Sequence, residues 1–107
     1  MMMRNKYGAK KVKSPDGQVF DSQKEYNRWG VLRLLERGGK ISDLKRQVSF
    51  ELIPKQNGER ACNYIADFTY WQDGQYVVED CKGYRTEGYK IKRKLMLWVH
   101  GIKIHET

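Results

Sequence analysis

The sequence contains few cysteines and no long apolar run. Only two of its 107 residues are cysteines, Cys62 and Cys81, which is too few for a disulfide framework. No cysteine or histidine pair has the spacing of zinc ligands, and His100 and His105 are more typical of packing or surface histidines. The longest apolar stretches span only a few residues, so no membrane segment is expected. These features favour a cytoplasmic protein with reduced thiols.

The N-terminus is basic, and no apolar segment follows it, so we do not expect a secretory signal. A chain of this length fits one domain and hardly two. We therefore expect a basic arm over residues 1–13 and a single domain over residues 14–107.

Positive charge is in excess and is clustered. The formal net charge is +8, and basic residues gather at the N-terminus and again between positions 82 and 94. Clustered basic residues favour a polyanionic partner, although basic tails often serve solubility alone. The residues that we expect to contact DNA are Lys10, Lys11, Lys13, Arg85, Lys90, Lys92 and Lys94.

Local patterns predict an α/β sandwich with one mixed sheet flanked by helices. The expected order is a hairpin around 14–17, a helix from Ser22 to Gly38, strands at 47–53, 63–71 and 75–82, a helix over about 87–99, and a strand at 102–104. The first helix begins with the capping-box pattern Ser22-Gln23-Lys24-Glu25. Trp29, Leu32 and Leu35 then follow a helical period, as Ile91, Leu95 and Trp98 do in the second helix.

Asp73-Gly74 predicts a tight hairpin between the strands at 63–71 and 75–82. With this turn, Asp67 faces Asp80, whereas a loop of odd length would shift the register. Opposed residues have Cβ atoms about 4.5–5.5 Å apart on one face of a sheet. The pattern therefore brings two carboxylates together.

Two neighbouring aspartates repel each other, and a buried pair is costly unless a cation lies between them. We expect burial, because their neighbours on the same face are Ile65, Thr69, Trp71, Tyr76 and Val78. Mg²⁺ suits such a site, since it accepts one or two carboxylates together with water and phosphate oxygens. Lys82 projects from the same face and could orient a water molecule or simply form a salt bridge with Asp80. Glu79 and Cys81 project from the opposite face, so Glu79 is not assigned to the site.

Glu25 has two interpretations. It could close the capping box of its helix, which is an ordinary structural role. It also shares a helix face with Trp29 and Leu32, so its carboxylate should point towards the sheet and could assist the metal site.

Glu25, Asp67 and Asp80-Cys81-Lys82 together resemble the signature of the PD-(D/E)XK nuclease superfamily. The order of elements is similar to its restriction-endonuclease-like αβββαβ core over residues 22–105. Three segments also resemble a small phage and prophage family of unknown function: the run at 16–25, Tyr64-Ile65-Ala66-Asp67-Phe68, and Val78-Glu79-Asp80-Cys81-Lys82-Gly83. Ala66 stands where the superfamily has proline, and an aspartate precedes the x-Lys.

The resemblance implies catalytic roles for Glu25, Asp67, Asp80 and Lys82. Asp67, Asp80 and the Cys81 carbonyl would bind Mg²⁺, for which Mn²⁺ could substitute, with Glu25 as an additional ligand. Lys92 or Lys94 would touch substrate phosphates. No organic cofactor is expected.

These inferences predict a Mg²⁺-dependent DNA endonuclease, selective for branched or junction DNA such as Holliday junctions, because no separate recognition domain fits in the chain. Cutting two strands needs two active sites, so a homodimer is expected. The host would be a bacterial cell, with the protein encoded by a phage or prophage. The alternative is a non-catalytic nucleic-acid-binding module, in which Tyr84 and Tyr89 could stack on bases.

Overall fold

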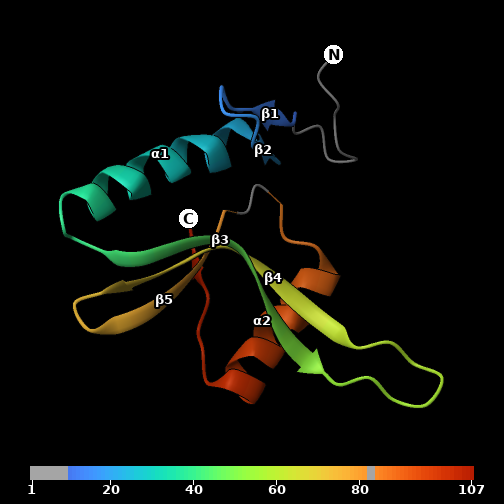
Figure 1. Ribbon diagram of the computed structural model, residues 1–107. Coiled ribbons are helices and arrows are strands. Elements are labelled where there is room, and N and C mark those ends of the chain that lie inside the picture. Colours follow the sequence, from blue (N-terminus) through green and yellow to red (C-terminus); the bar gives the residue numbers. More distant parts are fainter. Residues whose placement is uncertain (1–9, 82–83) are drawn as a thin grey trace.

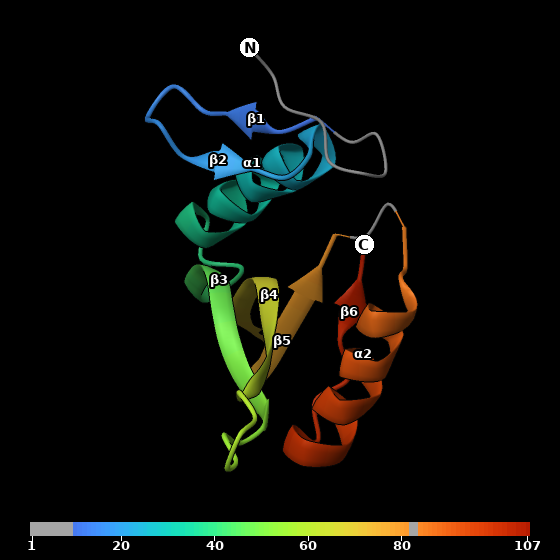
Figure 2. The same cartoon turned by 90° about the vertical axis from the view of Figure 1, so that its right-hand side faces the viewer.

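A four-stranded mixed sheet forms the middle layer of the fold, with one helix on each face. The computed structural model describes residues 10–81 and 84–107. Helix α1 (Gln23–Arg37) covers one face of the sheet and α2 (Glu87–His100) covers the other (Figures 1 and 2). The strands lie in the order β3 (Ser42–Ile53), β4 (Cys62–Gln72), β5 (Gln75–Asp80) and β6 (His105–Glu106). The predicted α/β fold with a mixed sheet is confirmed.

The N-terminal hairpin forms a separate two-stranded sheet of β1 (Val12–Lys13) and β2 (Val19–Phe20), which packs beside α1 (Figure 2). Its turn is closed by the Gly17 N–H, which donates to the Ser14 carbonyl at 2.9 Å, as the Pro15-Asp16-Gly17 pattern predicted. Val12 and Lys13 thus belong to the hairpin, so the expected arm boundary at residue 13 falls inside it. Residues 1–9 lie outside the described part of the chain.

Helix α1 begins and ends where its sequence signals predicted. The Ser22 hydroxyl accepts a hydrogen bond from the Glu25 N–H at 3.1 Å, which satisfies one N–H of the first turn. The helix ends at Gly38, and Gly39 has a positive φ of 76°. Leu32 is buried against Phe68 and Tyr70 of β4, so the predicted apolar face does pack on the sheet.

The β4–β5 hairpin has the predicted register. Gln72 pairs with Gln75 and Thr69 with Val78, across a turn in which Asp73 and Gly74 have φ angles of 51° and 76°. Two successive positive φ values are typical of a type I′ turn, whose twist matches that of the paired strands. The local turn chemistry therefore sets which residues of β4 and β5 face each other.

The alternation of side chains along β4 is interrupted at Asp67, which lies opposite Gln47 of β3. Ala66 contacts the α2-side core, whereas Phe68, two residues further on, contacts the α1-side core. A regular strand would place both side chains on one face. Gln47, opposite Asp67, has a φ of 53°, which is unusual for a residue other than glycine. Beyond this irregularity, the even-numbered residues of β4 point to the other face of the sheet. Ala66 therefore packs on the α2 side and Phe68 on the α1 side.

The expected burial around the two aspartates is correct only in part. Thr69 and Val78 are buried, but Ile65, Trp71 and Tyr76 are 55%, 44% and 37% exposed. Ile65 lies before the change of face, so it does not share the environment of the following residues. Trp71 and Tyr76 instead pack against each other near the hairpin turn, with ring centroids 5.2 Å apart.

Helix α2 has the expected extent, but of the three residues predicted on its buried face only Leu95 packs against the core. Thr86 caps its N-terminus and Gly101, with φ 67°, ends it. Tyr89 and Met96 are the buried residues, while Ile91 and Trp98 are 58% and 83% exposed. The sequence period identifies an apolar stripe but cannot tell which stripe faces the sheet. Here the aromatic ring of Tyr89 and the flexible side chain of Met96 fill the space beside Tyr64 and Val78.

This difference predicts opposite effects for two substitutions in α2. Met96→Ala should lower the free energy of unfolding by about 2–5 kcal/mol, because it leaves a cavity in a fully buried position. Trp98→Ala should change it by only about 0.5 kcal/mol, since the side chain is already in solvent. Urea unfolding of both variants would measure the contrast; equal losses would show that Trp98 is buried.

The final strand was expected at 102–104 but lies at His105–Glu106, parallel to β5. Ile102 and Ile104 pack into the core next to α2 instead of pairing along the sheet edge.

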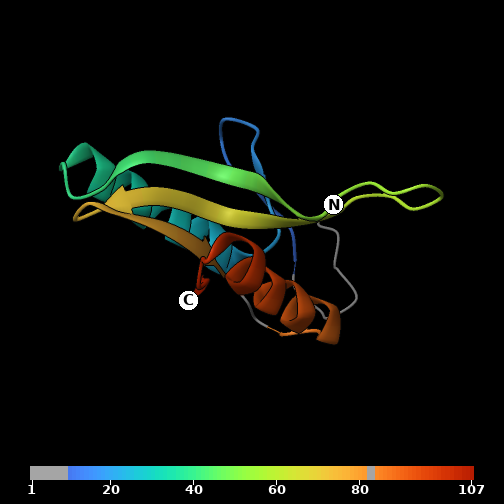
Figure 3. The same cartoon turned by 90° about the horizontal axis from the view of Figure 1, so that it is seen from below.

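The connection between β3 and β4 extends away from the layers (Figure 3). Within residues 10–81 and 84–107, neither helix is long and apolar enough to cross a membrane.

Candidate functional site

Asp67 lies in the middle of β4, and Asp80 is the last residue of the neighbouring strand β5. Phe68 and Glu79 form the last regular pair of the hairpin, and Asp67 and Asp80 are the next residues along the two strands. Both carboxylates are shielded from solvent, because Asp67 is 8% exposed and Asp80 is 0% exposed. The register predicted from Asp73-Gly74 therefore leads to two buried acids on neighbouring strands.

Hydrogen bonds orient each of these carboxylates. The Cys81 N–H donates to Oδ2 of Asp67 at 2.8 Å, and the Tyr64 hydroxyl donates to Oδ2 of Asp80. The pKa of Tyr64 is raised well above its ordinary value by burial and then by the negative charges of Asp80 and, more weakly, Asp67. Both carboxylates thus act on the same phenol, which places them in one electrostatic environment.

The donor chemistry at this point of the sheet suits a magnesium ion. A carboxylate is a hard oxygen ligand, and Asp67 and Asp80 bring two of them to neighbouring strands. Two hard oxygen ligands, completed by water and phosphate oxygens, are typical of Mg²⁺. Among the described residues, no cluster of three or more acidic, cysteine or histidine side chains could hold a metal ion. A metal here would therefore rest on the Asp67 and Asp80 pair.

The remaining residues of the predicted motif lie around this pair. Lys82, the predicted catalytic lysine, lies outside the described residues. Cys81 is next to Asp67 through its backbone N–H, and its Sγ lies 3.1 Å from the Thr107 hydroxyl. Burial raises the pKa of the Cys81 thiol, and the negative charges of Asp67 and Glu79 raise it further. The role of its carbonyl as a metal ligand stays a prediction.

Glu25 is buried, but on the α1 side of the sheet. It is 2% exposed, and its Oε1 lies 3.4 Å from both the Arg46 guanidinium and the Gln47 amide. Burial raises the pKa of Glu25. The carboxylate does point into the protein, as its position on the helix predicted. It does not form a common group of metal ligands with Asp67 and Asp80 in the described structure.

Glu79 has the structural role expected from its position on the opposite face. Arg28 of α1 donates to both of its carboxylate oxygens, at 2.7 and 2.8 Å, and the Tyr70 hydroxyl donates to Oε1 at 2.7 Å. This pairing raises the pKa of Arg28 further above its ordinary value. The ion pair joins α1 to β5 at Glu79, the residue next to Asp80, on the opposite face of the sheet from the Asp80 side chain. Sequence reasoning missed Arg28, because no local pattern connects residues 28 and 79.

A second group missed by sequence reasoning lies on the other side of Asp80. Glu106 of β6 is paired with Asp80 across the sheet. It accepts a hydrogen bond from the Tyr89 hydroxyl at 2.7 Å and forms ion pairs with Arg85 and Arg93 at 3.2 Å. Its pKa is lowered, mainly by the hydrogen bond from Tyr89 and also by the two arginines. Because the last strand was expected at 102–104, sequence reasoning did not place Glu106 beside Asp80.

The predicted DNA-contacting residues are only partly available. Lys10, Lys13, Arg85 and Lys94 are exposed, whereas Lys11, Lys90 and Lys92 are partly buried. Lys11 forms an ion pair with Asp21 at 2.8 Å, and Lys90 forms one with Glu87 at 3.2 Å. Tyr84 is 62% exposed, which is compatible with stacking, but Tyr89 is only 7% exposed and cannot stack on a base. The hydroxyl of Tyr89 is directed into the protein by Glu106.

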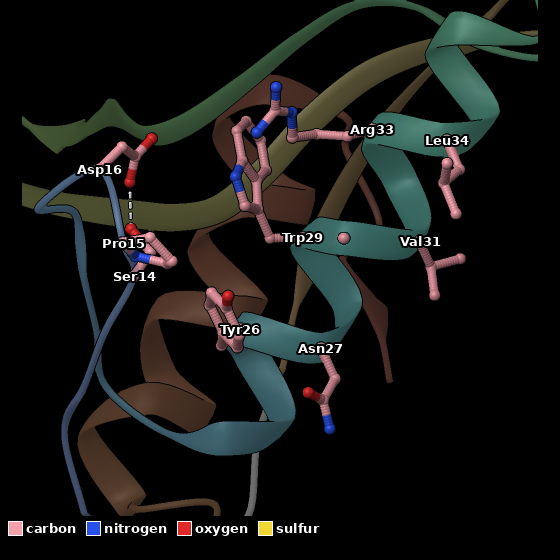
Figure 4. Close-up of a pocket in the computed structure, with 10 residues that line it drawn as sticks. Ser14, Pro15, Asp16, Tyr26, Asn27, Trp29, Val31, Arg33 and Leu34 are labelled. Carbon is pink, nitrogen blue, oxygen red and sulfur yellow. Dashed lines mark hydrogen bonds between the residues drawn. The ribbon is translucent and has the colours of Figure 1, made fainter.

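A pocket on the outer side of α1 is separate from the acidic pair. It lies between the β1–β2 turn and the helix, and Tyr26, Trp29 and Arg33 are among the side chains that line it (Figure 4). Of the predicted catalytic residues in the described part of the chain, neither Glu25 nor Asp67 nor Asp80 lines this pocket. Asp67 and Asp80 therefore do not form part of the wall or floor of this pocket.

The fold and the site define an α/β domain with two buried acidic residues on neighbouring strands. The sequence profile of a family described as "Protein of unknown function (DUF1064)" matches residues 4–104, so the chain belongs to this family. No curated protein and no solved structure matches the chain significantly.

Proposed function

We propose that the protein is a Mg²⁺-dependent DNA endonuclease of the PD-(D/E)XK superfamily. The observation that carries this proposal is the burial of Asp67 and Asp80 on neighbouring strands of a chain with a net charge of +8. A paired acidic site is unfavourable for a protein that only binds a polyanion. It is favourable where a divalent cation must be held next to a phosphate.

Each residue of the site has a definite task in this proposal. Asp67 and Asp80 hold the metal, which when bound polarises the scissile phosphate and lowers the pKa of a water molecule. Tyr64 and the Cys81 N–H keep the two carboxylates oriented, as hydrogen-bonding neighbours of metal ligands commonly do. Lys82, adjacent to Cys81 in sequence, holds the attacking water and offsets the charge that develops on the phosphate. Glu25, whose Oε1 lies 3.4 Å from the Gln47 amide, is the supporting acid on the α1 side of the sheet.

Metal-dependent stability gives the first test. We expect Mg²⁺ or Mn²⁺ to raise the melting temperature relative to EDTA, with a gain of about 2.7 kcal/mol at a metal concentration one hundred times Kd. Asp80→Asn should lose this gain, because it removes one of the two anionic ligands. Asp73→Asn makes the same charge change in the exposed hairpin turn and should keep it. A wild-type protein indifferent to metal would instead favour the non-catalytic binding module.

The substrate class is a further part of the proposal. We propose selection of DNA by shape, with branched or junction DNA as the preferred substrate, because the described elements are those of the sandwich and its N-terminal hairpin. A homodimer would supply the two active sites that cutting of both strands requires. Incubation with labelled junction, flap, duplex and single-stranded DNA in Mg²⁺ separates these substrates. Absence of cleavage of all four would contradict the endonuclease proposal.

A further inference from the structure

The group formed by Glu106, Arg85 and Arg93 lies directly beside the acidic pair. Glu106 is the sheet neighbour of Asp80, and the Thr107 N–H donates to the Asp80 carbonyl at 2.9 Å. The negative charge of Asp80 also contributes to the raised pKa of Tyr89, whose hydroxyl binds Glu106. Asp80 and Glu106 are therefore linked in two ways. Asp80 acts electrostatically on Tyr89, which is hydrogen-bonded to Glu106, and the two residues are paired between β5 and β6.

Glu106 holds the two arginines in fixed directions. Its Oε1 binds Nε of Arg85, its Oε2 binds one terminal nitrogen of Arg93, and both distances are 3.2 Å. The Arg93 guanidinium also lies over the ring of Tyr89, 6.0 Å from its centroid. Glu106 has a side-chain exposure of 20%, so the carboxylate is a partly buried anchor for the two arginines.

The arginines themselves reach solvent. Their side chains are 45% exposed for Arg85 and 36% exposed for Arg93. A guanidinium has five N–H donors, and each ion pair with Glu106 uses a donor on one side of the group. Two guanidinium cations on one carboxylate leave a net positive charge at the rim of the acidic pair. A planar donor array of this kind matches the oxygens of a phosphate.

We propose that Arg85 and Arg93 form a clamp for one backbone phosphate of the DNA, next to the phosphate at Asp67 and Asp80. Glu106 and Tyr89 are positioning residues of this clamp. The inference rests on the proposed nuclease function and adds a binding site to it. Preorganised arginines bind a phosphate at a lower entropic cost than flexible lysines do, so this clamp would set the register of the strand at the acidic pair.

A DNA-binding experiment in EDTA tests the clamp without relying on cleavage. Arg85→Gln and Arg93→Gln should each weaken binding of labelled junction or duplex DNA by about tenfold at low salt, because each removes a charge-assisted contact. The double variant should lose less than the product of the two single effects, since both side chains hold the same phosphate. It should also lower the slope of log K against log salt by about 0.9, the value for one phosphate.

Arg37→Gln is the matched control, because Arg37 is exposed at the C-terminal end of α1. Melting temperatures of all variants in EDTA would establish that they fold. Effects of Arg85→Gln and Arg93→Gln no larger than that of Arg37→Gln would overturn the clamp, as would fully multiplicative effects. If wild-type protein binds and cleaves DNA while the arginine variants match the control, only the clamp fails. If the wild type shows neither cleavage nor metal binding, the nuclease proposal fails.

Discussion

Replacing Asp80 with asparagine should abolish DNA cleavage while leaving most of the DNA affinity unchanged. The substitution removes a buried anionic ligand but keeps an oxygen that can accept the hydrogen bond of Tyr64. We expect the cleavage rate in Mg²⁺ to fall by at least about 100-fold, since transition-state charge is then poorly stabilised. DNA affinity in EDTA should stay within about twofold, because phosphate contacts by basic residues dominate it.

The same separation of cleavage from binding is expected for Lys82→Ala. Asp73→Asn serves as the control for the charge change, because Asp73 lies in the exposed turn between β4 and β5. Single-turnover cleavage and fluorescence anisotropy on the same labelled DNA would measure the two quantities. Asp80→Asn protein that still cleaves, or that loses binding together with cleavage, would argue against the proposed role of the acidic pair.

Replacing Arg28 with alanine should be among the most destabilising single changes in the protein. It leaves Glu79, which is 0% exposed, as a buried carboxylate without its cationic partner. Removal of one member of a buried ion pair typically costs about 3–5 kcal/mol. For a domain of this size each kcal/mol lowers the melting temperature by roughly 4–8 °C. Urea unfolding at neutral pH would measure the loss.

Arg33→Ala is the suitable control for this prediction. Arg33 is exposed on the same helix and lies 5.9 Å from the centroid of the Trp29 ring. Its removal should cost about 1 kcal/mol or less, as expected for an exposed cation over an aromatic ring. Equal losses in the two variants would mean that the contact between α1 and β5 does not depend on the Arg28–Glu79 pair.

Several features of the fold were predictable because a few adjacent residues determine them. Ser22 and Gly38 mark the ends of α1 by satisfying its terminal backbone groups. Asp73-Gly74 adopts the two positive φ angles of a type I′ turn, and this turn sets the register of β4 and β5. From that register alone, Asp67 and Asp80 could be placed on adjoining strands.

Other features of the site depend on residues far apart in the chain. Arg28 meets Glu79, Tyr64 meets Asp80, and Glu106 meets Arg93 only after the sheet and helices have packed. No periodicity or spacing connects such partners. Each pair is chosen by the packing geometry of the elements that carry it.

The sequence by itself determined the ends of α1 and the register of the β4–β5 hairpin, because these follow from short-range backbone geometry. Only the tertiary structure decided that α2 buries Tyr89 and Met96 while Trp98 stays in solvent. It also decided that the strands change face at Gln47 and that β6 brings Glu106 beside Asp80. The physical reason is that burial and strand neighbourhood depend on how whole elements fill space around one core, which the local pattern of side chains does not specify.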